Sequence, residues 1–230
     1  MSVLLDSFYF GIVISVVTYW AATWLQKKTG LVVCNNLLVA SLMIVALLKI
    51  FDIPYESFNK GASFINTMLG PATACLAVTI YNKIDLLKKY WLPVLAGCTV
   101  GVVTSVGCIL VMCRLFGLER SLTVSLLPKS VTTPIATAVA GANGGIVSIS
   151  VAAVIFTGIL GNLIAPLLIK IFRVKEPMAI GLGLGASAHA MGTARALEIG
   201  QTEGAMSGLA MGLCGLITAV AALLFPILIP

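Results

Sequence analysis

The stretch LLPKSVTTPIATAVAGANGG, residues 126–145, lies inside an otherwise apolar chain and limits how that chain can fold. Pro128 and Pro134 each remove a backbone hydrogen-bond donor, and Gly144 tolerates backbone angles that other residues avoid. Backbone without internal hydrogen bonds cannot face lipid, so it survives only where protein or water covers it. The stretch therefore predicts a broken helix that is buried against other helices.

The composition of the whole chain predicts a single integral membrane domain over residues 1–230. Hydrophobic residues make up 60% of the chain and charged residues 10%, whereas soluble domains carry about 25% charged residues. The net charge of +6 comes from basic residues between apolar runs, so we expect a lipid bilayer rather than a nucleic acid as the partner. The six cysteines form no CxxC pair, and we expect no metal or cofactor.

Runs that can cross a bilayer need about 20 mostly apolar residues. Six runs qualify: 5–25, 31–51, 62–82, 91–113, 145–169 and 204–229. Two further segments, 121–143 and 177–200, are long enough but rich in glycine, proline, hydroxyl groups and charge. The strongly basic loops all become cytoplasmic if these two segments enter the membrane and return without crossing.

We therefore expect an all-α polytopic membrane protein with about six full transmembrane helices and two broken or re-entrant segments. The same charge pattern places the N-terminus outside. An arrangement of eight tilted spans, with one more violation of the charge pattern, stays open as an alternative.

A shift of 60 residues aligns the segment 121–169 with the segment 181–229. Thr133 then meets Thr193, Pro166 meets Pro226, and Lys129 meets His189. The two segments would have opposite orientations in the membrane, so the alignment predicts an inverted repeat, a common device for building a transport site. The repeats lie in a C-terminal part, 117–230, that follows the N-terminal helices of 1–116.

Polar residues of the two broken segments are the candidate ligands of a small organic anion. A lysine within the membrane costs about 2.5 kcal/mol or more unless it finds a partner. A histidine can exchange protons near neutral pH, and an arginine presents a planar fork to a carboxylate. The predicted substrate-binding residues are Lys129, Ser130, Thr132, Thr133, His189, Thr193 and Arg195. For the hydroxyls the alternative is pairing with freed backbone groups, and for Arg195 it is an ion pair with Glu198.

Two further sets of residues complete the expected site. Helix breaks are predicted at Pro128, Pro134, Gly144 and Gly192. The opposite wall of the cavity is predicted to contain Asn36, Asn66, Pro71 and Thr73.

Four motifs resemble those of the LrgB/CidB family of bacterial membrane proteins, and the similarity covers about residues 30–229. They are NNLLVA (35–40), LGPATACLA (69–77), LLPKSVTTPIA (126–136) and GASAHAMGTARA (185–196). The chain departs from the family pattern at Asn36, where a proline is expected, and at Ala188, which separates Ser187 from His189. The resemblance implies a bacterial inner-membrane protein and a small partner of the LrgA/CidA type.

The function expected from these observations is transport of a small monocarboxylate such as pyruvate, glycolate or lactate, alone or with a proton. The resemblance carries this expectation, because related proteins transport such acids. It also supplies a second one, because family members are described as holin- or antiholin-like regulators of murein hydrolase activity and autolysis. A third alternative is a scaffold subunit of a two-component transporter. We expect no enzyme, since no nucleophile–base pair is evident. We expect a homo-oligomer, and small-residue runs such as GLAMGLCG (208–215) pack either within the protomer or between protomers.

Overall fold

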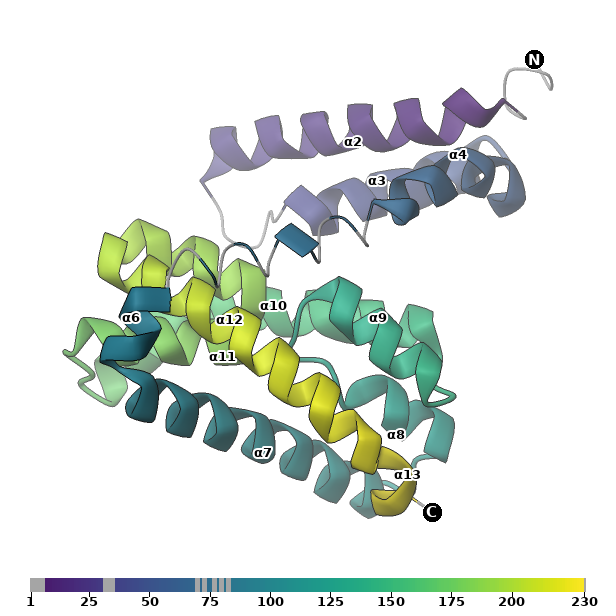
Figure 1. Ribbon diagram of the computed structural model, residues 1–230. Coiled ribbons are helices and arrows are strands. Elements are labelled where there is room, and N and C mark those ends of the chain that lie inside the picture. Colours follow the sequence, from purple (N-terminus) through teal and green to yellow (C-terminus); the bar gives the residue numbers. More distant parts are fainter. Residues whose placement is uncertain are drawn as a thin grey trace. The chain divides into compact units, whose positions relative to one another are not determined.

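The computed structural model describes residues 7–30, 36–68 and 84–229, with positions 71, 74, 75, 78 and 81 between the last two ranges (Figure 1). All regular structure within the described residues is helical, which confirms the all-α class. The chain divides into two compact units, Met1–Ala72 and Thr73–Pro230.

Helices that can cross a membrane, judged by length and composition, number four within the described residues. They are Phe8–Thr29, Trp91–Leu115, Val147–Ile171 and Gln201–Leu228. Each coincides with a predicted span, so the chain is a polytopic membrane protein. The predicted span 31–51 contains a described helix of 15 residues, and much of 62–82 lies outside the described residues.

The described residues of the N-terminal unit form three helices that pack closely. They are α2 (Phe8–Thr29), α3 (Asn36–Ile50) and α4 (Tyr55–Thr67). Gly11 of α2 and Gly61 of α4 face each other, because a Cβ on either would collide with a backbone carbonyl of the other helix. Small residues at such a crossing let two backbones approach and gain contact in a lipid environment.

The C-terminal unit is built around α12. Its elements are α6 (Ile84–Lys89), α7 (Trp91–Leu115), α8 (Arg120–Leu126), α9 (Thr133–Ala142), α10 (Val147–Ile171), α11 (Pro177–Ile199), α12 (Gln201–Ala221), η1 (Ala222–Leu224) and α13 (Phe225–Leu228). Residues 206–215 of α12 are all buried. The small-residue run 208–215 therefore packs inside the chain.

Helix α7 belongs to the C-terminal unit. Its buried stripe, Val94, Cys98 and Val102, joins the same hydrophobic cluster as Leu209 and Cys214 of α12. The two helices pack against each other in this unit (Figure 1). The boundary between the two compact units lies between residues 72 and 73.

Helix α11 is not one straight helix but two halves joined by a sharp bend. Ala188 (φ −125°, ψ 16°) and His189 (φ 42°, ψ −130°) leave the helical conformation. Beyond the bend, Gly192 returns so close to Leu184 that a Cβ on the glycine would collide with the Leu184 carbonyl. In a straight helix, residues eight apart are separated by about 12 Å along the axis. The two halves therefore fold back on each other.

The first half of α11 runs parallel to α12. Gly181 lies against the backbone of Glu203, and Gly185 lies against the backbone of Ser207. The residue numbers rise together in these two pairs, so both segments run in the same direction.

The second half of α11 runs antiparallel to α12. The hydroxyls of Thr193 and Ser207 are 2.9 Å apart, and Leu197 packs on Gly204. Here the numbers rise on one segment and fall on the other. The segment 177–200 is therefore a helical hairpin, which begins and ends at the same end of α12.

Segment 121–143 begins its own hairpin with α8 running parallel to α10. The Ile146 backbone N–H donates to the Ser125 hydroxyl at 2.7 Å. Farther along, Val131 shares a buried cluster with Val154. Residue numbers again rise together.

Helix α9 completes this hairpin by running back along α10. Ser150 donates to the Ala136 carbonyl at 3.4 Å, and a Cβ on Gly141 would lie 3.6 Å from the Val147 side chain. The numbers now run in opposite directions. Both segments that the sequence singled out are thus broken and return on themselves, unlike the tilted spans of the eight-span alternative.

The two hairpins approach the middle of the unit from opposite ends of α10. The first lies beside the start of α10 and reaches Val154 with Val131. The second packs Leu184 against Ala165 and reaches Val154 with His189. At 1.5 Å per residue, Val154 is roughly 10 Å inside the first residue of α10. This opposed entry is the arrangement expected of an inverted repeat.

The first hairpin is closed at its base by Ser125. Its hydroxyl donates to the Ser121 carbonyl at 2.6 Å and accepts from the Ile146 N–H at 2.7 Å. Ser125→Ala removes the hydrogen-bond acceptor of the Ile146 N–H, so we expect a loss of about 0.5–1.5 kcal/mol in the free energy of unfolding. Thermal unfolding in detergent measures it, with Ser148→Ala on the exposed face of α10 as the control. Equal stability of the two variants would contradict the expectation.

Candidate functional site

The tip of the first hairpin, residues 127–132, carries a charge. Pro128 is fully buried there, and the neighbouring Lys129 is partly buried. The Lys129 ammonium donates to the Ser130 hydroxyl at 3.1 Å, and the Ser130 and Ser105 hydroxyls are 2.9 Å apart. Ser105 belongs to α7, so this chain of hydrogen bonds ties the tip to a candidate span.

The Lys129 charge has no acidic partner in the described part of the chain. The ion pair of that part joins Arg195 to Glu198 instead. Both tips reach Val154, because Val131 of the first tip shares a buried cluster with it and the His189 Nε2 of the second lies 3.0 Å from its carbonyl oxygen. The tips of the two hairpins thus bring two basic side chains together with no carboxylate between them.

The tip of the second hairpin is held by the surroundings of His189, which is 5% exposed. Its Nε2 lies 3.0 Å from the Val154 carbonyl oxygen. Gly158 leaves room for the ring, since a Cβ there would lie 2.8 Å from the imidazole Cε1. A positive φ at a non-glycine residue costs about 1–3 kcal/mol and persists only where the surroundings enforce it. Thr193 adds a hydrogen bond to the His189 carbonyl at 3.0 Å.

Thr132 stands at the start of α9 with its hydroxyl unused. The residue is 5% exposed, and its Oγ1 is buried with no hydrogen-bond partner among the described residues. It occupies the N-cap position but makes no capping hydrogen bond. Thr133 and Pro134 form the first turn of α9, so the positive end of this helix dipole lies at the first tip.

Arg195 is engaged elsewhere. Its guanidinium contacts the Glu198 carboxylate at 2.6 Å, and the side chain is 31% exposed. The Arg195 Nε is buried without a hydrogen-bond partner in the described part of the chain. The ion pair with Glu198 that the sequence left open is therefore formed, six residues beyond the His189 bend.

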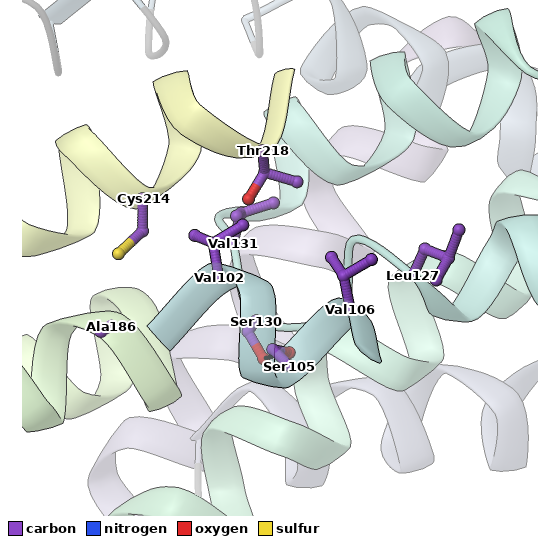
Figure 2. A pocket seen from close by; sticks show the side chains of 9 residues that line it. All are labelled: Val102, Ser105, Val106, Leu127, Ser130, Val131, Ala186, Cys214 and Thr218. Carbon is purple, nitrogen blue, oxygen red and sulfur yellow. Dashed lines mark hydrogen bonds between the residues drawn. The ribbon is translucent and has the colours of Figure 1, made fainter. Parts of the chain in front are cut away.

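A small pocket adjoins the first tip and is shown in Figure 2. It lies between α7, the tip, the first half of α11, and α12. Its lining residues are Val102, Ser105, Val106, Leu127, Ser130, Val131, Ala186, Cys214 and Thr218. Three of them carry hydroxyl groups and the others are apolar, so the pocket offers hydrogen bonds at a few fixed points.

Comparison with known proteins identifies the family. The model of the LrgB-like family matches residues 15–228. The chain belongs to the LrgB-like family. It is 37% identical over 213 residues to the antiholin-like protein LrgB of Bacillus mycoides (strain KBAB4) and to those of Bacillus cereus strains B4264 and Q1. Each alignment covers 92% of this chain and 93% of the relative. No solved structure matches the chain.

Helix breaks in this LrgB-like chain differ from the prediction at one position. Pro128 lies in the first tip, Pro134 lies in the first turn of α9, and Gly144 (φ 80°) lies in the turn before α10. The second break is at Ala188 and His189, not at Gly192. Gly192 serves the bend differently, because any side chain there would collide with the Leu184 carbonyl.

Three of the four residues predicted for the cavity wall, Asn36, Asn66 and Pro71, belong to the N-terminal unit of this LrgB-like chain. Asn36 donates to the Tyr19 hydroxyl at 3.1 Å, and Asn66 and Pro71 are exposed. Thr73 lies outside the described residues. These four positions stay a prediction.

Sequence reasoning missed Ser105 and Thr218, which line the pocket. Both lie in ordinary apolar spans, where a hydroxyl usually bonds to a backbone carbonyl of its own helix. Neither makes such a bond in the described structure. Whether a hydroxyl bonds to its own helix or faces a pocket depends on tertiary packing, which leaves no local signal in the sequence.

Proposed function

We propose that this LrgB-like membrane protein carries small monocarboxylates across the bilayer and binds them where the two hairpin tips meet. The observation that carries the proposal is Lys129, a partly buried ammonium without an acidic partner in the described structure, on a tip that reaches Val154 as His189 does. An unpaired charge away from water is costly. A mobile anion between the tips would stabilise both basic side chains.

The donors at the tips favour a carboxylate as that anion. The Lys129 ammonium, the Thr132 hydroxyl and the N-terminus of α9 all favour negative charge. The adjoining pocket is mostly apolar, which suits a short carbon chain rather than an inorganic anion. The proposed process is transport without chemical conversion of the acid.

The proposed roles follow from these positions. Lys129 holds the carboxylate, with Arg195 as a second cation if its pair with Glu198 opens. The hydroxyls of Ser130, Thr132, Thr133 and Thr193 contact the hydroxyl or keto oxygen of the acid. His189, held at a strained bend against Val154, acts as a proton-linked gate.

A second candidate function is an antiholin-like role in controlling lysis. It is favoured by the name of relatives that are 37% identical over 92% of the chain. Such a role would involve a pore or a regulator of one, together with a small LrgA/CidA-type partner. In this role the chain would form a homo-oligomer in the bacterial inner membrane. A further alternative is a scaffold subunit that supports a transporting partner.

Uptake into proteoliposomes tests the proposal against these alternatives. The purified chain is reconstituted, and entry of labelled pyruvate, glycolate and lactate is measured with and without a pH gradient. Saturable uptake of one acid with no leakage of a trapped dye supports a carrier. Dye leakage without saturable uptake supports a pore. If neither saturable uptake nor dye leakage is seen, a partner subunit is required. Co-reconstitution with an LrgA-type protein then tests the scaffold role.

Arg195→Gln is expected to lower uptake less than Lys129 variants do. The Arg195 guanidinium is already paired with Glu198 and is partly exposed, so its removal costs little at the tips. We expect a change of about threefold or less in the initial rate. Glu198→Gln, which frees Arg195, provides the matched comparison. A loss for Arg195→Gln as large as that for Lys129→Ala would place the carboxylate at Arg195 instead.

A further inference from the structure

A count of hydroxyl protons at the first tip leaves one unused. The Lys129 ammonium donates to Ser130 Oγ, and the Ser130 and Ser105 hydroxyls share one hydrogen bond. Each hydroxyl has one proton and can accept two hydrogen bonds. If Ser130 donates to Ser105, the Ser105 proton is free, and if Ser105 donates, the Ser130 proton is free. Either way, one O–H has no acceptor among the described residues.

The unused proton can be donated into the pocket. Ser105 and Ser130 both line it, and Figure 2 shows their side chains next to each other. Thr218 lines the same pocket from α12 and is 3% exposed. Its hydroxyl takes part in none of the hydrogen bonds of the described residues. The pocket thus presents two available hydroxyl protons, one from the Ser105–Ser130 pair and one from Thr218.

The surroundings of these hydroxyls select a particular kind of oxygen. Apart from the three hydroxyl residues the lining is apolar, as with Val102, Val131 and Ala186. A ligand atom that enters must therefore accept hydrogen bonds from the hydroxyls while its carbon chain contacts the apolar wall. The Lys129 ammonium donates to the Ser130 hydroxyl, which lines the pocket. A carboxylate bound to this ammonium would therefore place the carbon next to the carboxylate in the pocket.

We propose that Ser105 and Thr218 determine substrate specificity by binding the oxo or hydroxyl oxygen on the carbon next to the carboxylate. The inference rests on the proposed carrier function and adds two binding residues from α7 and α12 to it. An acid without that oxygen leaves both hydroxyls unpaired in a buried site. Sites that bind a substrate oxygen discriminate against analogues lacking it for this reason.

The test compares lactate with propionate, which differ only in the hydroxyl on that carbon. Initial uptake rates of both labelled acids, each well below saturation, are measured in proteoliposomes of the full chain. We expect the wild type to favour lactate, and Ser105→Ala to lower the lactate-to-propionate ratio by about fivefold, the effect of one hydrogen bond. Thr218→Val should lower the ratio similarly. Thr104→Ala, at the exposed neighbour of Ser105, should leave it unchanged.

The outcomes separate this inference from the carrier proposal. A fall in the ratio supports the inference, because a merely structural role would slow both acids equally. Equal slowing, or no preference in the wild type, overturns it while the carrier function stands. If the wild type takes up neither acid, both the specificity inference and the carrier proposal are overturned. Thr218 lies on α12 and Ser105 on α7. The Thr218→Val variant therefore still tests the inference if the Ser105→Ala protein does not fold.

Discussion

Lys129→Ala is expected to reduce saturable monocarboxylate uptake about 10- to 100-fold. Hydrogen bonds to charged groups contribute about 1.5–3 kcal/mol, and each 1.4 kcal/mol is a factor of ten. The described structure gives Lys129 no acidic partner, so an incoming carboxylate is the counter-charge that the variant would fail to bind. Initial uptake rates in proteoliposomes at low substrate concentration measure the effect.

Two controls separate binding from general effects of charge. Lys129→Gln keeps a donor for Ser130 but removes the charge, so it should resemble the alanine variant if charge is what matters. Lys170→Ala removes an exposed lysine at the end of α10 and should leave uptake unchanged. Wild-type uptake by Lys129→Gln would show that the ammonium serves only to hold Ser130.

A structural role for Lys129 would have a different signature. If its hydrogen bond mainly ties the first tip to α7, then Lys129→Ala should lower the unfolding temperature and leave the substrate affinity of the folded fraction unchanged. The binding role predicts the reverse, because removing an unpaired buried charge relieves its desolvation cost. Thermal unfolding with and without the substrate acid tells the two apart.

The sequence predicted the two hairpins because their determinants are local. Pro128 removes a backbone donor and the glycines after α9 permit left-handed backbone wherever they occur, and in a membrane such irregular backbone must be covered by protein or water. The shift of 60 residues paired Lys129 with His189. The structure places Lys129 in the tip 127–132 and His189 at the bend of α11. An internal repeat in the sequence thus shows that Lys129 and His189 occupy equivalent positions, even when no contact between residues is known.

The position of the second break could not be predicted in this way. The sequence predicts this break at Gly192, and glycine is the residue that adopts positive φ most easily. The chain bends at His189 instead, where the Val154 carbonyl and the space left by Gly158 hold the imidazole. Both lie on α10, more than 30 residues earlier in the chain. Contacts of that range leave no local pattern.

Gly185→Ala is the second variant for which we expect a large effect, this time on folding. A Cβ at Gly185 would collide with the Ser207 carbonyl and approach Ser207 Cα to 2.9 Å. The obstacle is backbone in the middle of α12, so no rotamer change can make room. Overpacking of this kind costs about 1–3 kcal/mol. Thermal unfolding and gel filtration in detergent measure the loss.

Gly183→Ala is the matched control, two residues earlier in the same half of α11. Nothing lies within 4 Å of a Cβ at Gly183. Alanine should be neutral there or stabilise the helix by about 0.5–1 kcal/mol. If both variants unfolded alike, a general sensitivity of α11 to substitution would replace the close approach to α12 as the cause.

The Gly185 contact also bears on the tip of the second hairpin. Ser207 faces Gly185 on one side of the bend, and its hydroxyl is 2.9 Å from that of Thr193 on the other side. Displacing Ser207 would disturb Thr193, which in turn donates to the His189 carbonyl. We therefore expect any folded Gly185→Ala protein to lose uptake as well as stability, whereas Gly183→Ala keeps both. A stable Gly185→Ala protein with normal uptake would show that α11 and α12 can separate without consequence for the His189 bend.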